Sequence, residues 1–246
     1  MKKSTTKDYI LEKLELNKGR YITGMELANE LGISRNAIWK VISDLKSEGY
    51  QISSVNNKGY CLSEDSDIIS IAGIRNALGG EYKRIADNIA IYDELESTNR
   101  TAKLELVTGM IDKKIIIARK QTSGRGHNNS HFKSPEGGIY ISIILQPEDL
   151  IQGRKGNIIS TNKIGETVLA VIKDITNKNA VLDKKLNRIT IGKKQVCGIL
   201  TEYFADMETS TINGYVIGIG IKNINISKNL CIAKLLTAFA SYINID

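Results

Sequence analysis

Apolar residues recur at helical spacing in three short segments near the start of the chain. The first segment, residues 7–16, carries an apolar stripe made of Ile10, Leu11 and Leu14. The second follows Thr23, an N-cap candidate with Glu26 in capping-box spacing, and ends at Gly32. The third follows Ser34, and its inward-facing positions are Ile38, Val41, Ile42 and Leu45. This pattern predicts one helix followed by a helix-turn-helix.

A β-hairpin is expected directly after these helices. Residues 50–64 alternate apolar and polar positions around a turn at residues 57–59, which places a wing behind the helix-turn-helix. The polar face of the third helix supplies cationic, amide and aromatic groups suited to phosphates and base edges. The alternative is a protein-docking module with a solvated polar face, but caps, turn, basic helix and wing occur in the order typical of winged-helix DNA binding. The expected DNA contacts are Ser34, Arg35, Asn36, Trp39, Lys40, Asn57 and Lys58.

The second part of the chain has a different pattern of apolar and polar residues. A polar, acidic segment at residues 63–70 is a candidate linker, and residues 68–80 predict a short helix stopped by two glycines. Short β-branched runs follow from about residue 85, with helical patterns around residues 97–108, 157–177 and 229–242. We therefore expect a winged helix at 1–65 and an α+β domain built on a mixed sheet at 70–246.

Charge and composition narrow the class of protein. The net charge of the 246-residue chain is +7, yet residues 1–66 carry 10 Lys/Arg against 9 Asp/Glu, so DNA binding must depend on where the charges lie. No apolar stretch reaches about 18 residues and no secretory signal is evident, which predicts a cytoplasmic protein without a membrane partner. The three cysteines are odd in number and far apart, so we expect reduced thiols. No metal site is expected, because His127 and His131 lie in a loop without a carboxylate or cysteine nearby.

Five motifs carry a family resemblance. They are Glu96-Ser97-Thr98-Asn99, Gln121-Thr122-Ser123-Gly124-Arg125-Gly126, Tyr140 within GGIYISI, Cys197-Gly198-Ile199-Leu200, and Gly218-Ile219-Gly220-Ile221. Their order and spacing resemble bifunctional biotin–protein ligases, which also repress biotin genes. The resemblance implies a class II synthetase-like fold for the second domain. It also implies a pocket for biotin and biotinyl-5′-AMP.

The resemblance implies a reaction and a set of site residues. Biotin and ATP give the adenylate, and a lysine of a carrier protein then takes the biotinyl group; ATP and Mg²⁺ are needed only if the ligase is active. Lys184 matches the family lysine that neutralises charge on the activated carboxylate and phosphate. The ligand contacts carried over are Ser97, Thr98, Asn99, Gln121, Gly124, Arg125, Gly126, Tyr140, Lys184, Gly198, Leu200, Gly218 and Gly220.

The chain departs from the family pattern on the nucleotide side of the expected site. Where the family loop has further arginines, this chain has His127 and Ser130, so two positive charges are lost. The family motif K-W-x-N-D becomes Lys184-Lys185-Leu186-Asn187-Arg188, which replaces an aspartate by an arginine. Lys222 stands where the family has asparagine. The small C-terminal β-domain of the family has no counterpart before residue 246.

These departures predict a biotin-responsive repressor that binds operator DNA and whose ligase activity is weak or lost. A biotin-like effector is expected to order residues 121–132 and to promote a homodimer. Two alternatives stay open at this point. One is an active bifunctional ligase that biotinylates a carrier protein, and the other is a regulator that senses a different small acid.

Overall fold

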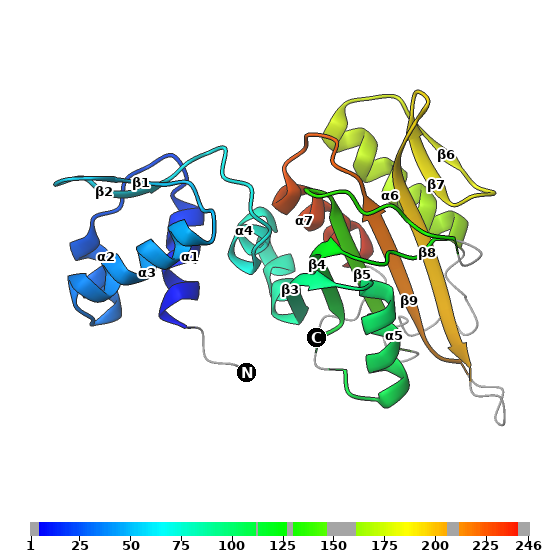
Figure 1. Cartoon of the computed structure of the whole chain (residues 1–246), viewed down its shortest axis with the longest axis horizontal. Helices are drawn as coiled ribbons and strands as arrows, with labels where there is room; N and C mark the ends of the chain where they lie inside the picture. The colour runs from blue at the N-terminus through cyan, green and yellow to red at the C-terminus, as the bar shows by residue number, and fades with distance from the viewer. Residues whose placement is uncertain (1–4, 112, 127–129, 147–160, 206–211, 241–246) are drawn as a thin grey trace.

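The computed structural model describes residues 5–111, 113–126, 130–146, 161–205 and 212–240. It has a small N-terminal domain of helices with a hairpin and a larger domain around one sheet (Figure 1). Among the described residues, no helix is long and apolar enough to span a bilayer.

The N-terminal domain contains the predicted helix, helix-turn-helix and wing. Its helices are α1 (Thr6–Leu16), α2 (Gly24–Leu31) and α3 (Arg35–Ser47), and its hairpin pairs β1 (Ile52–Val55) with β2 (Gly59–Leu62). Thr23 Oγ1 accepts a hydrogen bond from Glu26 N at 3.1 Å, and Ser34 Oγ accepts one from Ala37 N at 3.2 Å. Gly32 ends α2 in the left-handed conformation, with φ of 63°. These caps fix where each helix begins and ends, as expected.

Helical turns lead into the larger domain. Helix α4 (Ile71–Ala77) is the short helix that the sequence predicts, and it is followed by a 3₁₀ helix, η1 (Gly80–Asn88), that was not predicted. The remaining helices are α5 (Thr98–Thr108), α6 (Thr161–Thr176) and α7 (Lys228–Phe239).

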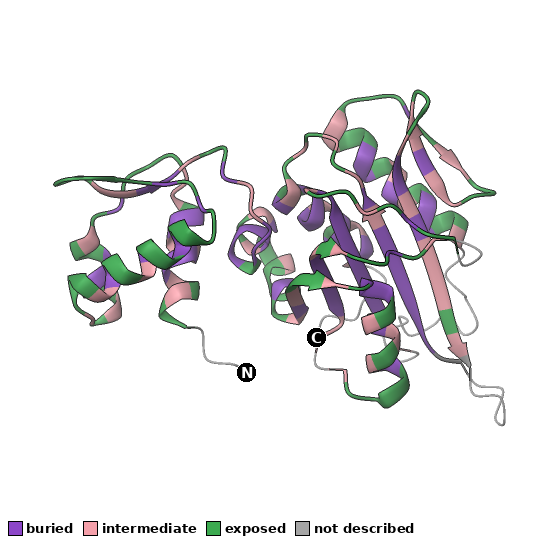
Figure 2. Cartoon of the chain, in the orientation of Figure 1, coloured by how far each residue is buried: buried purple, intermediate pink, exposed green. Residues whose placement is uncertain are grey.

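Seven strands form one mixed sheet. They are β3 (Ile89–Leu95), β4 (Ile115–Gln121), β5 (Ile139–Leu145), β6 (Ala180–Asp183), β7 (Arg188–Ile191), β8 (Lys194–Ala205) and β9 (Ile212–Ile221). Their order is β3-β4-β5-β9-β8-β7-β6, in which only β3 and β4 pair in parallel. Both faces of the sheet are covered, so the central strands are buried along their length and read as continuous apolar runs (Figure 2).

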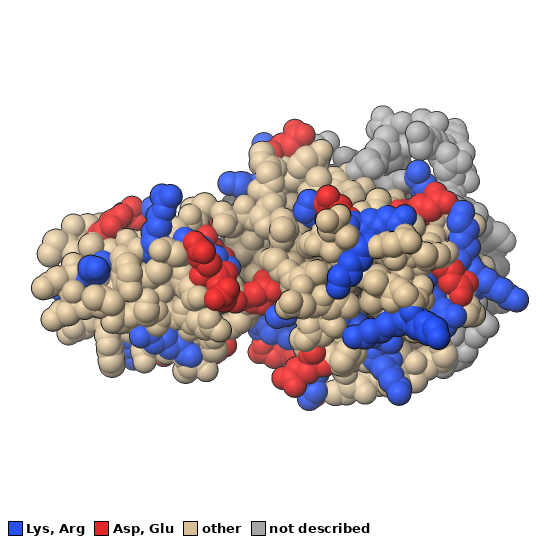
Figure 3. Space-filling view, turned by 90° about the horizontal axis from the view of Figure 1, so that it is seen from above, with Lys and Arg blue, Asp and Glu red and all other residues tan. Residues whose placement is uncertain are grey.

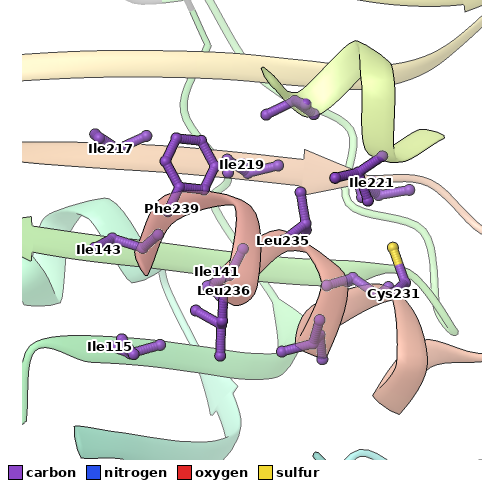
Figure 4. Packing of buried hydrophobic residues seen from close by; sticks show 14 of the residues in the cluster. Ile115, Ile141, Ile143, Ile217, Ile219, Ile221, Cys231, Leu235, Leu236 and Phe239 are labelled. Atoms are coloured by element: carbon purple, nitrogen blue, oxygen red, sulfur yellow. The ribbon is translucent and has the colours of Figure 1, made fainter. Parts of the chain in front are cut away.

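The two faces of the sheet have separate cores. Helices α6 and α7 cover one face, where Leu235, Leu236 and Phe239 pack on isoleucines of β4, β5 and β9 (Figure 4). Helix α5 covers the other face, where Ala102 and Leu106 pack on Ile116, Ile144 and Val216. Alternate strand residues therefore point to opposite faces, and the α5 face holds the candidate site.

The segment expected to be a simple linker is bound to the larger domain. Asp67 Oδ2 accepts a hydrogen bond from Lys228 N at 2.7 Å, at the start of α7. The side chain of Asn229 accepts from Ser70 N at 3.1 Å and donates to Ile68 O at 2.9 Å. Because these bonds satisfy backbone groups on both sides, residues 66–70, here called the joint, are held in one conformation.

Two cations hold the joint from other directions. Arg119 Nη2, on β4, donates to Ile69 O at 2.7 Å, and Lys18 Nζ, just after α1, donates to Ser66 O at 2.5 Å. Arg119 lies two residues before Gln121, which is a predicted ligand contact. The joint therefore touches both the N-terminal domain and the strand that leads to the candidate site.

Candidate functional site

A cavity of about 510 Å³ opens on the α5 face of the sheet, beyond the N-terminal end of α5. It is bounded by the start of α5, the end of β4, residues 125–126 and 130–133, and the central strands. All the predicted ligand contacts except Gly124 and Lys184 line it. The motifs that are scattered along the sequence therefore meet at one place.

A network of buried polar side chains forms one wall of the cavity. Gln121 Oε1 accepts hydrogen bonds from Thr98 N at 2.8 Å and from Thr98 Oγ1 at 3.2 Å. Ser142 Oγ donates to Asn99 Oδ1 at 2.6 Å and lies 2.8 Å from Thr98 Oγ1. The interlocked groups are held with little freedom, which suits a site that must present donors and acceptors in fixed positions. We call these residues, together with Ser97, the polar wall.

Ser142 was not predicted as part of the site. It is fully buried and supports Thr98 and Asn99 from β5 without lining the cavity. A signal was present in the sequence, because Ser142 is a small polar residue between isoleucines in Ile139–Leu145 and shares the face of Tyr140. A buried serine in such a strand needs a polar partner.

Asn99 connects the polar wall to the strand behind it. Its Nδ2 donates to Glu202 Oε2 at 3.0 Å, and Glu202 also lies 3.7 Å from Lys103 Nζ. A Cβ on Gly218 would come within 2.0 Å of Asn99 Oδ1. The sequence predicted that Gly218 lets the backbone approach a ligand; in the structure this glycine makes room for Asn99.

Gly198 and Gly220 have a second unexpected neighbour. They pair across β8 and β9, and the ring of Phe132 lies against both. A Cβ on Gly198 or on Gly220 would come within 2.7 or 2.6 Å of that ring. These two glycines were predicted to contact the ligand. In the structure the Phe132 ring covers their backbone, and we call this pair of glycines the glycine bed. A ligand that reaches this bed must displace the phenylalanine ring.

The loop between β4 and β5 closes on itself near the cavity. Gly126 N donates to Ser130 O, and Phe132 N donates to Gly124 O, both at 2.8 Å. Gly124 does not line the cavity, because it packs inside this loop, where a Cβ would come within 2.6 Å of Phe132 O. Gly124 was predicted as a ligand contact, but in the structure it allows the loop to close. Arg125 does line the cavity, and His127 lies outside the described residues.

Lys184 does not reach the cavity, contrary to the expectation from the resemblance. Its Nζ lies 2.8 Å from Glu166 Oε1 on α6, and its side chain is 58% exposed. The hydrogen bond from Lys184 holds the pKa of Glu166 below its usual value. The ammonium group is therefore already paired at the outer surface of the domain.

Arg188 lines the cavity in place of the lysine. Its Nε lies 3.2 Å from Asp183 Oδ2, while Asp183 Oδ1 accepts hydrogen bonds from the backbone amides of Lys185 and Leu186, both at 3.1 Å. Asp183 thus closes the turn between β6 and β7 and orients Arg188. A carboxylate engaged in this way is not available as a metal ligand.

The remaining reactive groups at the site are passive. Burial raises the pKa of the Tyr140 hydroxyl to about 12, and this hydroxyl donates to Pro135 O. Burial also raises the pKa of the Cys197 thiol, which makes this side chain a poor nucleophile. Among the described residues, no cluster of His, Cys, Asp and Glu could hold a metal ion. The cavity residues therefore do not fit Mg²⁺.

The predicted DNA contacts are exposed residues of the N-terminal domain. Ser34, Arg35, Asn36 and Lys40 are exposed at or along α3, and Trp39 is 63% exposed on the same helix. Asn57 and Lys58 are exposed at the hairpin tip. Figure 3 shows basic and acidic side chains on both domains, with one group of acidic side chains near the boundary between them.

Comparison with known proteins decides the family. A model of a helix-turn-helix domain matches residues 6–61, and the model of the biotin/lipoate A/B protein ligase family matches residues 92–222. The chain belongs to this ligase family. It is 31% identical over 230 residues to the bifunctional ligase/repressor BirA of Bacillus subtilis, covering 92% of this chain and 67% of that protein. Identity to BirA of Escherichia coli is 28% over 207 residues, covering 84% of this chain and 60% of that protein.

Solved structures support the same fold. The biotin acetyl coenzyme A carboxylase synthetase of Helicobacter pylori, solved with bound biotinylated ATP, superposes with a TM-score of 0.52 at 19% identity. The match covers 63% of this chain and 74% of that one. The family resemblance and the α+β fold class predicted from the sequence are confirmed. The chain spans about two thirds of the length of the bacterial relatives, or slightly less.

Proposed function

We propose that this chain is a biotin-responsive transcriptional repressor whose ligase activity is weak or absent. The observation that carries the proposal is the contrast between the two sides of the cavity. The polar wall is complete and held by its own hydrogen bonds, whereas Lys184 is paired with Glu166 outside the cavity. The site is thus equipped to bind a ligand but not to activate one.

The effector is biotin or biotinyl-5′-AMP. The polar wall offers hydroxyl and amide groups that can pair with a ureido ring, and Arg125 can pair with a carboxylate. Ligand entry displaces Phe132 from its glycine bed and so rearranges the loop at 124–132. The loop rearrangement promotes a homodimer, which places two α3 helices on operator DNA. Sedimentation with and without biotin measures this step.

The ligase activity is tested by transfer to a carrier. We expect the pure protein, given biotin, Mg·ATP and a biotin carrier domain, to transfer less than about one biotinyl group per minute. The reasons are the distance of Lys184 from the cavity and the absence of a free carboxylate among its described lining residues. A heat-treated sample gives the background. Faster transfer contradicts the proposal.

An active bifunctional ligase is the second candidate. It is favoured by the 31% identity to a bifunctional ligase/repressor. The transfer experiment separates it from the first candidate. A sensor of another small acid is a third possibility, and a melting temperature that rises with another acid but not with biotin would identify it.

DNA binding is expected to depend on the exposed face of α3. The double substitution Arg35→Ala with Lys40→Ala should weaken operator binding and reduce the slope of log affinity against log salt by about 2, because two phosphate contacts are lost. Fluorescence anisotropy at several salt concentrations measures both. The matched control is Lys83→Ala with Arg84→Ala, which removes two exposed charges from η1. An unchanged slope in the α3 variant would remove these residues from the interface.

A further inference from the structure

The ionisable side chains of opposite charge are not balanced in the cavity, because basic residues predominate among the described lining residues. Its basic lining residues are Arg125, His131, Lys133, Arg188 and Lys222, and no aspartate or glutamate is among the described residues that line it. Cations gathered around a partly enclosed space create a positive potential there, which favours an anionic ligand and opposes a divalent cation.

Arg188 and Lys222 both lie near the glycine bed. Arg188 pairs with Gly198 across β7 and β8, and Gly198 pairs with Gly220, so the three residues form one row across the sheet. Lys222 follows β9, and its Nζ lies 5.7 Å from the centre of the Phe132 ring that occupies the bed. A ligand that replaces this ring would therefore meet both cations.

Both cations retain hydrogen-bonding capacity. Asp183 engages Nε of Arg188, and among the described residues no other hydrogen bond or ion pair involves the guanidinium, so both Nη groups remain available. Lys222 Nζ contacts the face of Phe132 and, within the same described residues, has no carboxylate partner. An arginine held at Nε presents its Nη donors in a fixed direction, which suits a planar or tetrahedral anion.

We infer that Arg188 and Lys222 form the anion-binding end of the cavity and bind the carboxylate or phosphoryl group of the ligand directly, without a divalent cation. The inference rests on the proposed biotin-like effector and adds a specificity element to it. The arginine that removes the family carboxylate from this position thus has a function of its own. Its guanidinium can give the anion a direct, charge-assisted hydrogen bond.

The inference is tested by calorimetry on four proteins and three probes. The proteins are the wild type, Arg188→Ala, Lys222→Ala and the control Lys193→Ala, which removes an exposed charge from the turn between β7 and β8, outside the cavity. The probes are biotin, neutral biotinamide and AMP, each with Mg²⁺ and with EDTA. We expect Arg188→Ala and Lys222→Ala to weaken biotin and AMP binding about tenfold or more. Biotinamide binding and the Lys193→Ala variant should change little, and EDTA should have no effect.

The outcomes separate this inference from the proposed function. If Arg188→Ala binds biotin and AMP as tightly as the wild type does, the anion-binding end is overturned, even if biotin acts as the effector. A requirement for Mg²⁺ also overturns it. AMP binding that needs Arg188, with no binding of biotin or biotinamide, supports the anion-binding end and contradicts the biotin proposal. Melting curves exclude unfolding, and Arg188→Lys, which keeps the charge, should retain part of the affinity if charge is the cause.

Discussion

Replacing Gly218 with alanine is expected to dismantle the polar wall and abolish biotin binding. The new Cβ would lie 2.0 Å from Asn99 Oδ1, so the Asn99 side chain must leave its place. It then loses its hydrogen bonds to Ser142 and Glu202, which stay buried or half-buried without that partner. Unsatisfied groups of this kind cost about 1–3 kcal/mol each. Urea unfolding should show a loss of roughly 3 kcal/mol, and calorimetry should show no binding.

Gly79→Ala is the matched control. No atom lies within 4 Å of a Cβ built at Gly79, and its backbone is extended with φ of −88°, which alanine adopts readily. The control should therefore keep the stability and ligand affinity of the wild type. If Gly218→Ala binds biotin normally, the polar wall is not the ligand contact and the proposed effector site is wrong.

Asn229→Ala is expected to loosen the joint between the two domains. The substitution removes the acceptor of Ser70 N and the donor to Ile68 O, which leaves the backbone of the joint unpaired in a buried setting. At about 1–3 kcal/mol for each of the two lost partners, and about 2–4 °C per kcal/mol for a chain of this size, the melting temperature should fall by at least about 4 °C. Limited proteolysis should then cut within residues 66–70, where the wild type resists.

A surface asparagine provides the comparison for this substitution. Asn162→Ala changes an exposed position on α6 and should leave both melting and proteolysis as in the wild type. The Asn229→Ala variant should still bind DNA through α3, because the contacts of that helix are untouched. Wild-type resistance to proteolysis in this variant would show that the contacts from Arg119 and Lys18 are enough to hold the joint.

Local features of the fold followed from the sequence. The caps at Thr23 and Ser34 and the left-handed Gly32 are short-range devices, so neighbouring residues alone determine them. The 3₁₀ helix at Gly80–Asn88 was missed, although Tyr82, Ile85 and Ala86 stand at helical spacing, because it directly follows the two glycines that were read as a stop. The strands of the sheet were visible as β-branched runs because both faces are buried.

The sequence indicated many of the residues that line the cavity but not the directions of their side chains. The motifs identified most of the cavity lining, since their residue types are needed there. The direction of Lys184 could not be predicted, because it depends on Glu166, a partner 18 residues away on α6. Gly198 and Gly220 were predicted as ligand contacts and line the cavity, but only the folded loop shows that the Phe132 ring fills the space above them. The local sequence pattern does not specify the direction of a side chain when that direction depends on a partner far away in the sequence.

The joint at residues 66–70 also affects which separations of operator half-sites a dimer can bind. A flexible tether lets each α3 search for its half-site independently, so one repressor tolerates operators of many lengths. Here Asp67 joins the first turn of α7, and Arg119 joins the sheet, so the reach of α3 is set by the body of the larger domain. In such a dimer the distance between the two α3 helices is fixed. Its operators should then share one half-site separation, and an insertion of about five base pairs, which turns one half-site to the opposite side of the duplex, should not be accommodated.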